Sequence, residues 1–448
     1  MMKKTGSFLL LIVLVLSLAL GVGGATAAPK TQQVTELVIF WAQWPPADYL
    51  QEIGNRYEAE TGIKITVIQE PWGSFYDRMS AEWAAKGDAY DMVVGDSQWL
   101  GQGAEQGHYM ELTDFMVEND LVDTVTAATL KYYGEFPANS GRYWAYPTEG
   151  DAVGWAYRKD RLENPEEMAA FEAEYGYPLA VPETWAELRD IAEFFYRPDE
   201  NVYGVGVYTQ KDYDGMIMGY ENVMFSWGVD WQDENNQVLG VVNSEKAVEA
   251  LEFYKGLYQF APPGTNNAFY TEMNSVFVNG QATMIMNYFA FLPDLLNAEK
   301  NPYAGVTGFF AGPAGPYGDR YTALGGQGMS VLNYVSNERK QASLDFIKWF
   351  ASDEVQQQWA DVGGYTCNIG VLESEEFLNN TPYNRAFADS MTFVKDFWNI
   401  PVYGELLEPA QRYINGYVVG NVGTAKEALD GMAVEQHEIL AAAGVIDG

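Results

Sequence analysis

Three short apolar segments near the start of the chain alternate with stretches of helical periodicity, and this alternation constrains the fold more than any other feature. Apolar residues in both intervening stretches recur at i, i+3, i+4 or i+7, and Gly62 and Gly87 follow as helix stops. Strands separated by helices of this length are typical of parallel sheets with crossover connections. The sequence therefore predicts an α/β fold with strands at Glu36–Phe40, Ile63–Ile68 and Asp91–Val94.

Each of these predicted strands ends in aromatic residues that stand beside amides or carboxylates. Ligands of open α/β sheets lie outside the carboxyl ends of the strands, so the three groups are expected to meet in one crevice. Aromatic rings stack on the apolar faces of sugars, and fixed polar groups hold the hydroxyl edges, so the pattern favours a sugar or polyol ligand. The candidate residues are Trp41, Gln43 and Trp44 after the first strand, Glu70 and Trp72 after the second, and Asp96, Gln98 and Trp99 after the third.

The first residues have the form of a cleaved signal peptide. Lys3 and Lys4 precede an apolar stretch, and Ala25-Thr26-Ala27 provides small residues for cleavage, which predicts a signal peptide over residues 1–28. The apolar stretch is shorter than the roughly 20 residues that a membrane span needs. Because the only cysteine, Cys367, is far from this leader, no lipid-anchor cysteine is available. We therefore expect export to the periplasm without stable membrane insertion, and a buried Cys367.

Charge and length limit the partners and the architecture. The chain of 448 residues has 62 acidic and 26 basic residues, which gives a formal net charge of −36. Such a surface is a poor partner for nucleic acid or anionic membranes. Roughly 420 residues remain after the leader, which is long for one core and suits two lobes.

Later segments continue the mixture of strands and helices. The sequence predicts strands at Val153–Tyr157, Tyr203–Tyr208 and Thr283–Met286. A capping box formed by Thr184 and Glu187 predicts a helix start. Asn243-Ser244 predicts another helix start, and a stretch rich in Gly and Pro, Gly305 to Gly328, separates this block from the C-terminal helices.

The order of these segments resembles the family 1 extracellular solute-binding proteins of carbohydrate ABC importers, the group that includes the maltose-binding protein. Each motif is weak alone, and the resemblance depends on their number, order and spacing over nearly all of the chain after the leader. The motifs are Glu60–Ile65, Tyr90–Asp96 with Gly107 and Leu112, Tyr146-Pro147, Tyr157–Asp160, Pro182–Trp185, Asn243–Ala247 and Phe277–Ala282.

The resemblance implies a two-lobe periplasmic binding protein fold of the α/β class, with the ligand in an interlobe cleft. It implies a discontinuous N-lobe of residues 36–149 plus 309–352 and a C-lobe of residues 150–306 plus 353–448. It also implies hinge closure around the ligand, delivery to the permease subunits of an ABC importer, and a monomer. The expected function is the capture of a neutral sugar, oligosaccharide or polyol.

The resemblance also carries over site positions, residue by residue. Gln98 and Trp99 replace a charged pair of the maltose-binding relative, and Asp151 stands at the carboxylate after the Tyr-Pro crossing. The remaining positions are Asn287, Tyr288 and Phe289 after the short strand, Gly326 and Gln327 in the Gly-Gly loop before a late strand, and Tyr365 in the loop Gly363–Gly370. Tyr365 and Asn368 stand where relatives often have Pro and Arg, which disfavours an anionic ligand.

Other interpretations of these residues remain open. The tryptophans at the strand ends could belong to the core, as is expected for Trp83, Trp155, Trp185, Trp349 and Trp359. Glu149 and Asp151 could form the catalytic carboxylate pair of a secreted glycosidase or lyase, although two carboxylates also accept hydrogen bonds from sugar hydroxyls. With two histidines and one cysteine, the chain offers no metal site, His-based triad or cofactor motif. A binding protein for a peptide, an amine or a phosphodiester is a further alternative.

Overall fold

The structure is a computed structural model that describes residues 34–212 and 215–447, so the predicted signal peptide lies outside the described residues. A five-stranded sheet, the first sheet, has the order β2-β1-β3-β10-β4. β1 pairs in parallel with β2 and β3, as predicted, while β10 runs antiparallel to β3 and β4. Its strands are β1 (Glu36–Ala42), β2 (Lys64–Glu70), β3 (Met92–Asp96), β4 (Tyr146–Glu149) and β10 (Gln327–Val331).

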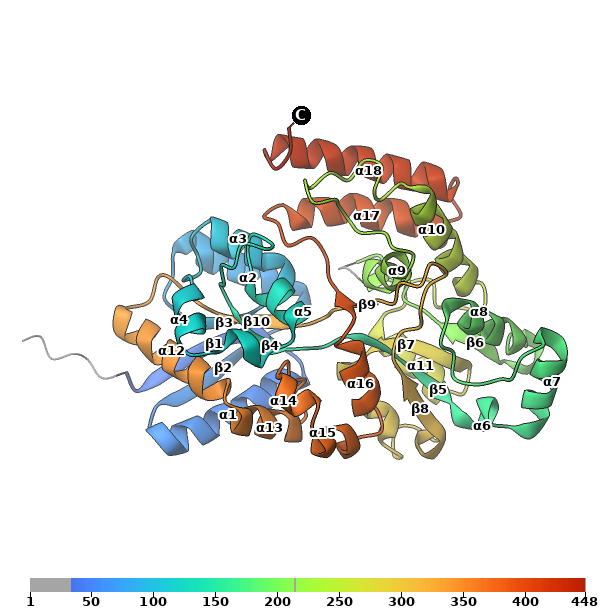
Figure 1. Ribbon diagram of the computed structural model, residues 1–448, viewed down its shortest axis with the longest axis horizontal. Helices are drawn as coiled ribbons and strands as arrows, with labels where there is room; N and C mark the ends of the chain where they lie inside the picture. Colours follow the sequence, from blue (N-terminus) through green and yellow to red (C-terminus); the bar gives the residue numbers. More distant parts are fainter. Residues whose placement is uncertain (1–33, 213–214, 448) are drawn as a thin grey trace, which may run out of the picture. The chain divides into compact units, whose positions relative to one another are not determined.

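The register of the first sheet brings the predicted strand ends to one edge. Ala42 pairs with Glu70 at the carboxyl ends of β1 and β2. The amino end of β10 reaches the same edge, because Gln327 pairs with Asp96 on one side and Glu149 on the other. Residues separated by 231 positions therefore lie side by side where the sheet ends (Figure 1).

Three helices contact the first sheet: α1 (Pro45–Thr61), α2 (Trp72–Ala85) and α12 (Asn337–Phe350). Helices α1 and α2 contain the predicted apolar stripes. Trp44 is the N-cap residue of α1, and Trp72 is the first residue of α2. Helix α1 packs closely on β2, since a Cβ at Gly54 would lie 2.7 Å from the Cβ of Ile65. The two helix starts thus hold both tryptophans at the strand ends.

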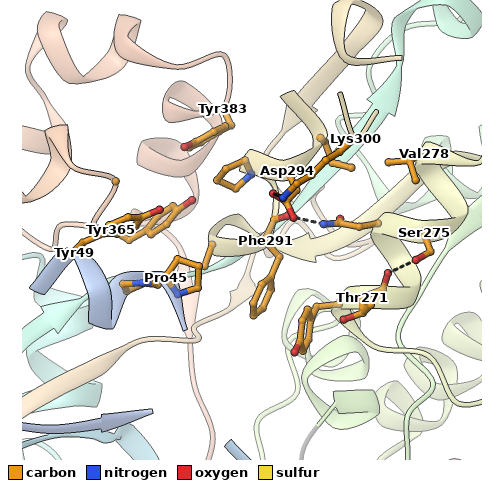
Figure 2. Close-up of a pocket in the computed structure, with 17 residues that line it drawn as sticks. Pro45, Tyr49, Thr271, Ser275, Val278, Phe291, Asp294, Lys300, Tyr365 and Tyr383 are labelled. Atoms are coloured by element: carbon orange, nitrogen blue, oxygen red, sulfur yellow. Dashed lines mark hydrogen bonds and ion pairs between the residues drawn. The ribbon is translucent and has the colours of Figure 1, made fainter. Parts of the chain in front are cut away.

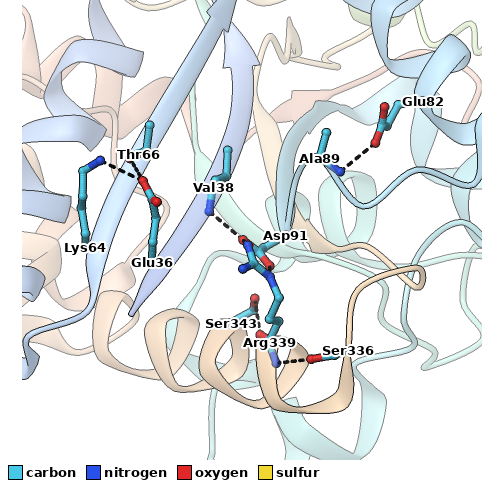
Figure 3. Close-up of polar contacts among 10 residues, drawn as sticks. All are labelled: Glu36, Val38, Lys64, Thr66, Glu82, Ala89, Asp91, Ser336, Arg339 and Ser343. Atoms are coloured by element: carbon cyan, nitrogen blue, oxygen red, sulfur yellow. Dashed lines mark hydrogen bonds and ion pairs between the residues drawn. The ribbon is translucent and has the colours of Figure 1, made fainter. Parts of the chain in front are cut away.

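A buried carboxylate ties the opposite end of the first sheet to α12. The side chain of Asp91, which is 0 % exposed, accepts a hydrogen bond of 2.7 Å from the backbone N–H of Val38. Its two oxygens also accept from Nε and Nη2 of Arg339, at 2.5 Å each (Figure 3). Bidentate pairs of this kind fix geometry as well as charge. Asp91 therefore joins β1, β3 and α12 away from the strand ends that carry the candidate residues.

The second sheet has four strands in the order β6-β7-β5-β8. These are β5 (Val153–Arg158), β6 (Tyr203–Gly206), β7 (Ala282–Tyr288) and β8 (Thr307–Phe310). Val153 pairs with Tyr288, which places the start of β5 beside the end of β7. The predicted capping box is confirmed: Thr184 and Glu187 cap α8 (Trp185–Phe194) reciprocally, and Ser244 caps α10 (Glu245–Tyr258).

Helices α8, α10 and α11 (Tyr270–Val278) contact the second sheet, and α9 (Gly215–Ser226) contacts α10. Helices α17 (Tyr403–Val418) and α18 (Ala425–Ala442) pack on one another beside α10 (Figure 1). The two-stranded sheet of β9 (Thr322–Ala323) and β11 (Val394–Lys395) is parallel. The remaining α-helices are α3 (Leu100–Glu105), α4 (Thr113–Glu118), α5 (Ala127–Thr129), α6 (Lys159–Leu162), α7 (Pro165–Tyr175), α13 (Asp353–Asp361), α14 (Ile369–Leu372), α15 (Glu375–Asn380) and α16 (Asn384–Ser390).

Strand pairing and helix contacts differ from the predicted lobe limits at two places. The predicted limit at 309 falls inside β8, which pairs with β5 of the second sheet. Helix α13 lies in residues predicted for the C-lobe, but it contacts α1, which packs on the first sheet. The first difference lies within the Gly/Pro-rich stretch, where no strand was predicted and β8 is found. The division of the chain into two lobes stays a prediction.

The core contains the aromatic residues for which a structural role is expected. Trp83, Trp155, Trp185 and Trp359 are at most 2 % exposed, whereas Trp349 is only partly buried. Cys367 is buried with a free thiol, as predicted. Among the described residues, no helix is both long and apolar enough to cross a membrane.

Candidate ligand-binding cleft

A cavity of about 680 Å³ lies between the strand ends of the two sheets. Side chains from the first sheet form one side of it, which we call the first wall: Trp44, Trp72, Gly73, Tyr76, Asp77 and Asp96. The other side, the second wall, comes from the region of the second sheet: Gln210, Asp212, Met218, Phe269, Tyr270, Thr271, Glu272, Tyr288 and Phe291. Asp151 and Gly325, in two connections between the sheets, complete the lining.

Interlocked tryptophan rings build the first wall. The rings of Trp44 and Trp72 meet edge to face with centroids 5.3 Å apart, and Trp41 packs behind Trp44 at 5.7 Å. Trp44 is 7 % exposed, and its indole Nε1–H has no hydrogen-bond partner among the described residues.

Asp96 is positioned by buried side chains behind the cavity. The indole Nε1–H of Trp41 donates to Oε1 of Gln327, and Nε2 of Gln327 donates to Oδ1 of Asp96 at 3.4 Å. Trp41 and Gln327 are both 0 % exposed, so neither lines the cavity. These two predicted site residues therefore lie behind the cavity and hold Asp96 in place, while Asp96 itself lines the first wall.

Asp151 lies where the chain crosses from β4 to β5. Its carboxyl accepts hydrogen bonds from the backbone N–H groups of Ala152 at 2.8 Å and Ala290 at 3.2 Å. Burial raises the pKa of Asp151 to about 8, although these backbone donors lower it in part. A neutral carboxyl at this place can both donate a hydrogen bond to a ligand hydroxyl and accept one.

Glu149 is two residues from Asp151 but does not reach the cavity. Glu149 is 0 % exposed, and Oε2 accepts a 3.4 Å hydrogen bond from the backbone N–H of Tyr365. Burial and the neighbouring Asp151 raise its pKa well above the usual range. Only one of the two carboxylates therefore faces the cavity, whereas glycoside hydrolysis uses two that flank the bond.

A hydrogen-bond network centred on Asn287 supports the second wall. The hydroxyl of Tyr208 donates to Oδ1 of Asn287 at 2.6 Å, and Nδ2 of Asn287 donates to Oδ1 of Asn274 at 2.9 Å. The same amide nitrogen donates to the backbone carbonyl of Tyr270 at 3.1 Å. Asn287 is 0 % exposed, so this predicted site residue orients Tyr270 from behind, while its neighbour Tyr288 lines the cavity.

Several other residues predicted for the site lie beside the cavity without lining it. Gln98 donates to the hydroxyl of Tyr403 at 3.4 Å, and the ring of Trp99 packs on Tyr76 at 5.1 Å. Glu70 accepts a 2.6 Å hydrogen bond from Ser74 Oγ. Gln43 is exposed and borders a separate, shallow hollow. Trp99 therefore supports the wall residue Tyr76, and the other three make contacts outside the cavity.

Phe289 and Gly326, two further residues predicted for the site, pack against neighbouring chain segments and do not line the cavity. The ring of Phe289 contacts Phe387 at 5.5 Å and fills the space that Gly154 leaves, where a Cβ would lie 2.3 Å from the ring. A Cβ at Gly326 would lie 2.0 Å from the backbone oxygen of Glu149. Glycine is thus required at residue 326 by the close approach of two chain segments.

A second cavity of about 410 Å³ adjoins the first and shares Tyr270, Thr271 and Phe291 with it. Figure 2 shows Tyr49 and Tyr365 on one side of this second cavity and Thr271 and Ser275 on the other. The hydroxyl of Tyr365 donates to the backbone oxygen of Phe289 at 2.6 Å. The predicted site residue Tyr365 therefore lines the second cavity rather than the first.

Sequence reasoning missed most of the second wall. Phe269, Tyr270, Thr271 and Glu272 stand at the start of α11 and follow no strand. Glu272 Oε2 accepts a 3.0 Å hydrogen bond from the backbone N–H of Phe269, a helix-start signal that local sequence could have indicated. The stacking of Tyr270 on Phe291, with centroids 4.1 Å apart, joins distant segments and has no local signal.

The chemistry of the cavity is that of a binding site for polar molecules with apolar faces. Seven lining residues are aromatic, and five are acidic. Within residues 34–212 and 215–447, no group of three or more His, Cys, Asp or Glu side chains could hold a metal ion.

Comparisons with known proteins agree with this geometry. The sequence profile described as "Bacterial extracellular solute-binding protein" matches residues 42–357. A probable ABC transporter-binding protein of Deinococcus radiodurans is 26 % identical over 363 residues, which cover 77 % of this chain and 79 % of that protein.

Two solved structures share the fold at low sequence identity. One is an ABC transporter solute-binding protein of Agrobacterium radiobacter in complex with ribitol, with a TM-score of 0.74, 22 % identity, and coverage of 91 % of this chain and 99 % of that one. The other is maltose-bound MalE3 of T. maritima, with a TM-score of 0.75, 23 % identity, and coverage of 90 % of this chain and 100 % of that one. The fold common to these structures is that of two-domain periplasmic binding proteins.

Proposed function

Because the chain belongs to the bacterial extracellular solute-binding protein family, we propose that it captures a sugar or polyol in the cavity between its two walls and delivers it to an ABC importer. Membership in this family makes the protein a binding protein and not an enzyme. The permease subunits of the importer are its proposed macromolecular partner. The proposed site is the 680 Å³ cavity, which is of the size that small-molecule ligands occupy.

One observation carries the choice of ligand class: aromatic side chains from both walls enclose the cavity together with carboxylates and an amide. Trp44, Trp72, Tyr270 and Phe291 offer apolar faces. Asp96, Asp151 and Gln210 offer acceptors and donors for hydroxyl groups. The ribitol and maltose in the two structures of similar fold support this ligand class.

The predicted leader, lobes and monomer belong to the same proposal. We infer that residues 1–28 direct export to the periplasm and are cleaved, and that two lobes close around the ligand by a hinge motion. The proposed hinge is formed by the connections that contain Asp151 and Gly325, which run between the two sheets and lie side by side, since the backbone N–H of Gly325 donates to the backbone oxygen of Asp151 at 2.9 Å.

Calorimetric titration against a panel of monosaccharides, disaccharides and polyols tests the proposed function. We expect at least one of them to bind with a dissociation constant in the micromolar range, which corresponds to about −8 kcal/mol. If no member of the panel binds below a millimolar, the ligand class is wrong.

A matched pair of tryptophan variants tests the site. Trp72 and Trp349 are both partly buried, but only Trp72 lines the cavity. Trp72→Ala is expected to weaken binding at least about tenfold, or 1.4 kcal/mol, because a stacking surface is lost. Trp349→Ala should keep the affinity of the wild-type protein. Equal effects of the two variants would place the ligand elsewhere.

A further inference from the structure

The two cavities differ in charge. The first cavity is lined by Asp77, Asp96, Asp151, Asp212 and Glu272, and no lysine or arginine among residues 34–212 and 215–447 lines it. The second cavity contains both signs, since Nζ of Lys300 pairs with Oδ1 of Asp294 at 2.8 Å (Figure 2). An acidic lining without lysine or arginine thus distinguishes the first cavity from the second.

Backbone amides hold Glu272 without cancelling its charge, because its carboxylate accepts a hydrogen bond from the backbone N–H of Phe269. Asp151 also accepts from backbone N–H groups, those of Ala152 and Ala290. Burial raises the pKa of Asp151 to about 8, so at pH 7 it offers a neutral hydrogen-bonding group and no charge. By contrast, the buried carboxylate of Asp91 pairs with the guanidinium of Arg339. A backbone amide orients a carboxylate but carries no full charge, so a cationic group of a ligand would be attracted here.

Aromatic rings stand beside the same carboxylates. Trp44, Trp72, Tyr270, Tyr288 and Phe291 line the cavity, and ring faces attract ammonium groups within about 6 Å. Asp96 and Gln210 stand in the same lining and can exchange hydrogen bonds with hydroxyl groups. The cavity therefore fits a ligand with both a positive group and hydroxyl groups.

We propose that the solute carries a protonated amino group in addition to its hydroxyl groups, so that its chemical class is an amino sugar or an amino polyol. This inference rests on the proposed function and narrows it. The family resemblance implies a neutral ligand, and the net charge of −36 argues against an anionic one. The same charge attracts cations, and a cleft lined by one sign of charge concentrates ligands of the opposite sign.

Matched ligand pairs that differ only in the amino group test the proposal. The pairs are D-glucosamine with D-glucose, D-galactosamine with D-galactose, D-mannosamine with D-mannose, and 1-amino-1-deoxy-D-sorbitol with D-sorbitol. Calorimetry at pH 7 and low salt should show, in at least one pair, that the amine binds about tenfold or more tightly than its neutral partner. N-acetylation of that amine, which removes the charge, should abolish the advantage.

Variants of two exposed carboxylates test where the amino group is recognised. Asp77→Asn and Asp212→Asn each remove one charge from opposite walls, and Asp199→Asn removes one charge outside the cavities. We expect at least one of the two wall variants to reduce the preference for the amine by about two- to fivefold. The preference should be unchanged in Asp199→Asn and should fall as salt is raised.

Two results would overturn the inference. One is a neutral sugar or polyol that binds in the micromolar range while its amino counterpart binds equally or more weakly; the proposed function then stands and the amino group is wrong. The other is that no amine of the four pairs binds below a millimolar. If the neutral partners and the wider panel also fail, the proposed function fails together with this inference.

Discussion

The two walls of the cavity differ in how they are built. The first wall stands on the carboxyl ends of parallel strands, and its tryptophan rings contact one another from Trp41 through Trp44 to Trp72. The second wall comes from a helix start and from loops, and buried hydrogen bonds of Asn287 hold it in place. Ring packing thus orders the first wall and a polar network the second, so the two should respond differently to substitution.

The largest expected effect is in the first wall. Trp41→Ala removes a ring that is 0 % exposed and leaves Gln327 without its donor. We expect a loss of about 3–5 kcal/mol in the free energy of unfolding, as for other large buried aromatic residues. Chemical denaturation measures it. A loss below about 1 kcal/mol would mean that the first wall does not depend on its interlocked rings.

The next effect concerns pH and the connection that contains Asp151. Its folded-state pKa of about 8 lies above the ordinary value of 3.8, so the folded state holds a proton that the unfolded state has released. The resulting stabilisation is complete below pH 4 and is lost as the pH rises through about 8. One such proton changes the free energy of unfolding by at most about 1.4 kcal/mol for each pH unit.

Asp151→Asn should therefore flatten the decline in stability between pH 5 and pH 8, because an amide does not ionise. The amide oxygen can still accept from Ala152 and Ala290. Thermal unfolding across this pH range compares the variant with Asp199→Asn, an exposed charge change elsewhere. Parallel curves for Asp151→Asn and the wild-type protein would show that Asp151 is ionised in the folded state.

A smaller effect is expected in the second wall. Asn287→Ala removes the acceptor of the Tyr208 hydroxyl and the donor to Oδ1 of Asn274. The loss of such buried hydrogen bonds costs about 1–3 kcal/mol. Denaturation gives this value, and ligand affinity should fall as well because Tyr270 loses its support. Unchanged affinity at reduced stability would separate Asn287 from the site.

The smallest predicted effect tests the ring pair that the two cavities share. Phe291→Leu removes the stacking on Tyr270 but keeps most of the apolar volume. The expected change in the free energy of unfolding is about 0.5–1.5 kcal/mol. An effect as large as that of Trp41→Ala would contradict the contrast between a wall of interlocked rings and a wall held by hydrogen bonds.

The α/β class could be predicted from the sequence, because strand and helix periodicity is local. The family and its two-lobe fold could be predicted because the number, order and spacing of short motifs resemble those of known members. Trp44, Trp72 and Asp96 were also predictable, since parallel strands bring their carboxyl ends to one edge. Trp41 and Gln327 were predicted for the site but lie behind the cavity wall. Which residues line the cavity and which lie behind it depends on side-chain packing, which the sequence does not show. Tyr270 and Phe291 were missed because their meeting depends on tertiary contacts between α11 and the segment after β7.

The central claim is that one ligand contacts both walls at once. Titration of Trp72→Ala and Phe291→Ala with the tightest ligand of the sugar, polyol and amine panel tests it most directly, because each variant removes a ring from a different wall. The account predicts at least about tenfold weaker binding for each variant. Wild-type affinity in either variant, with the protein folded, would contradict it.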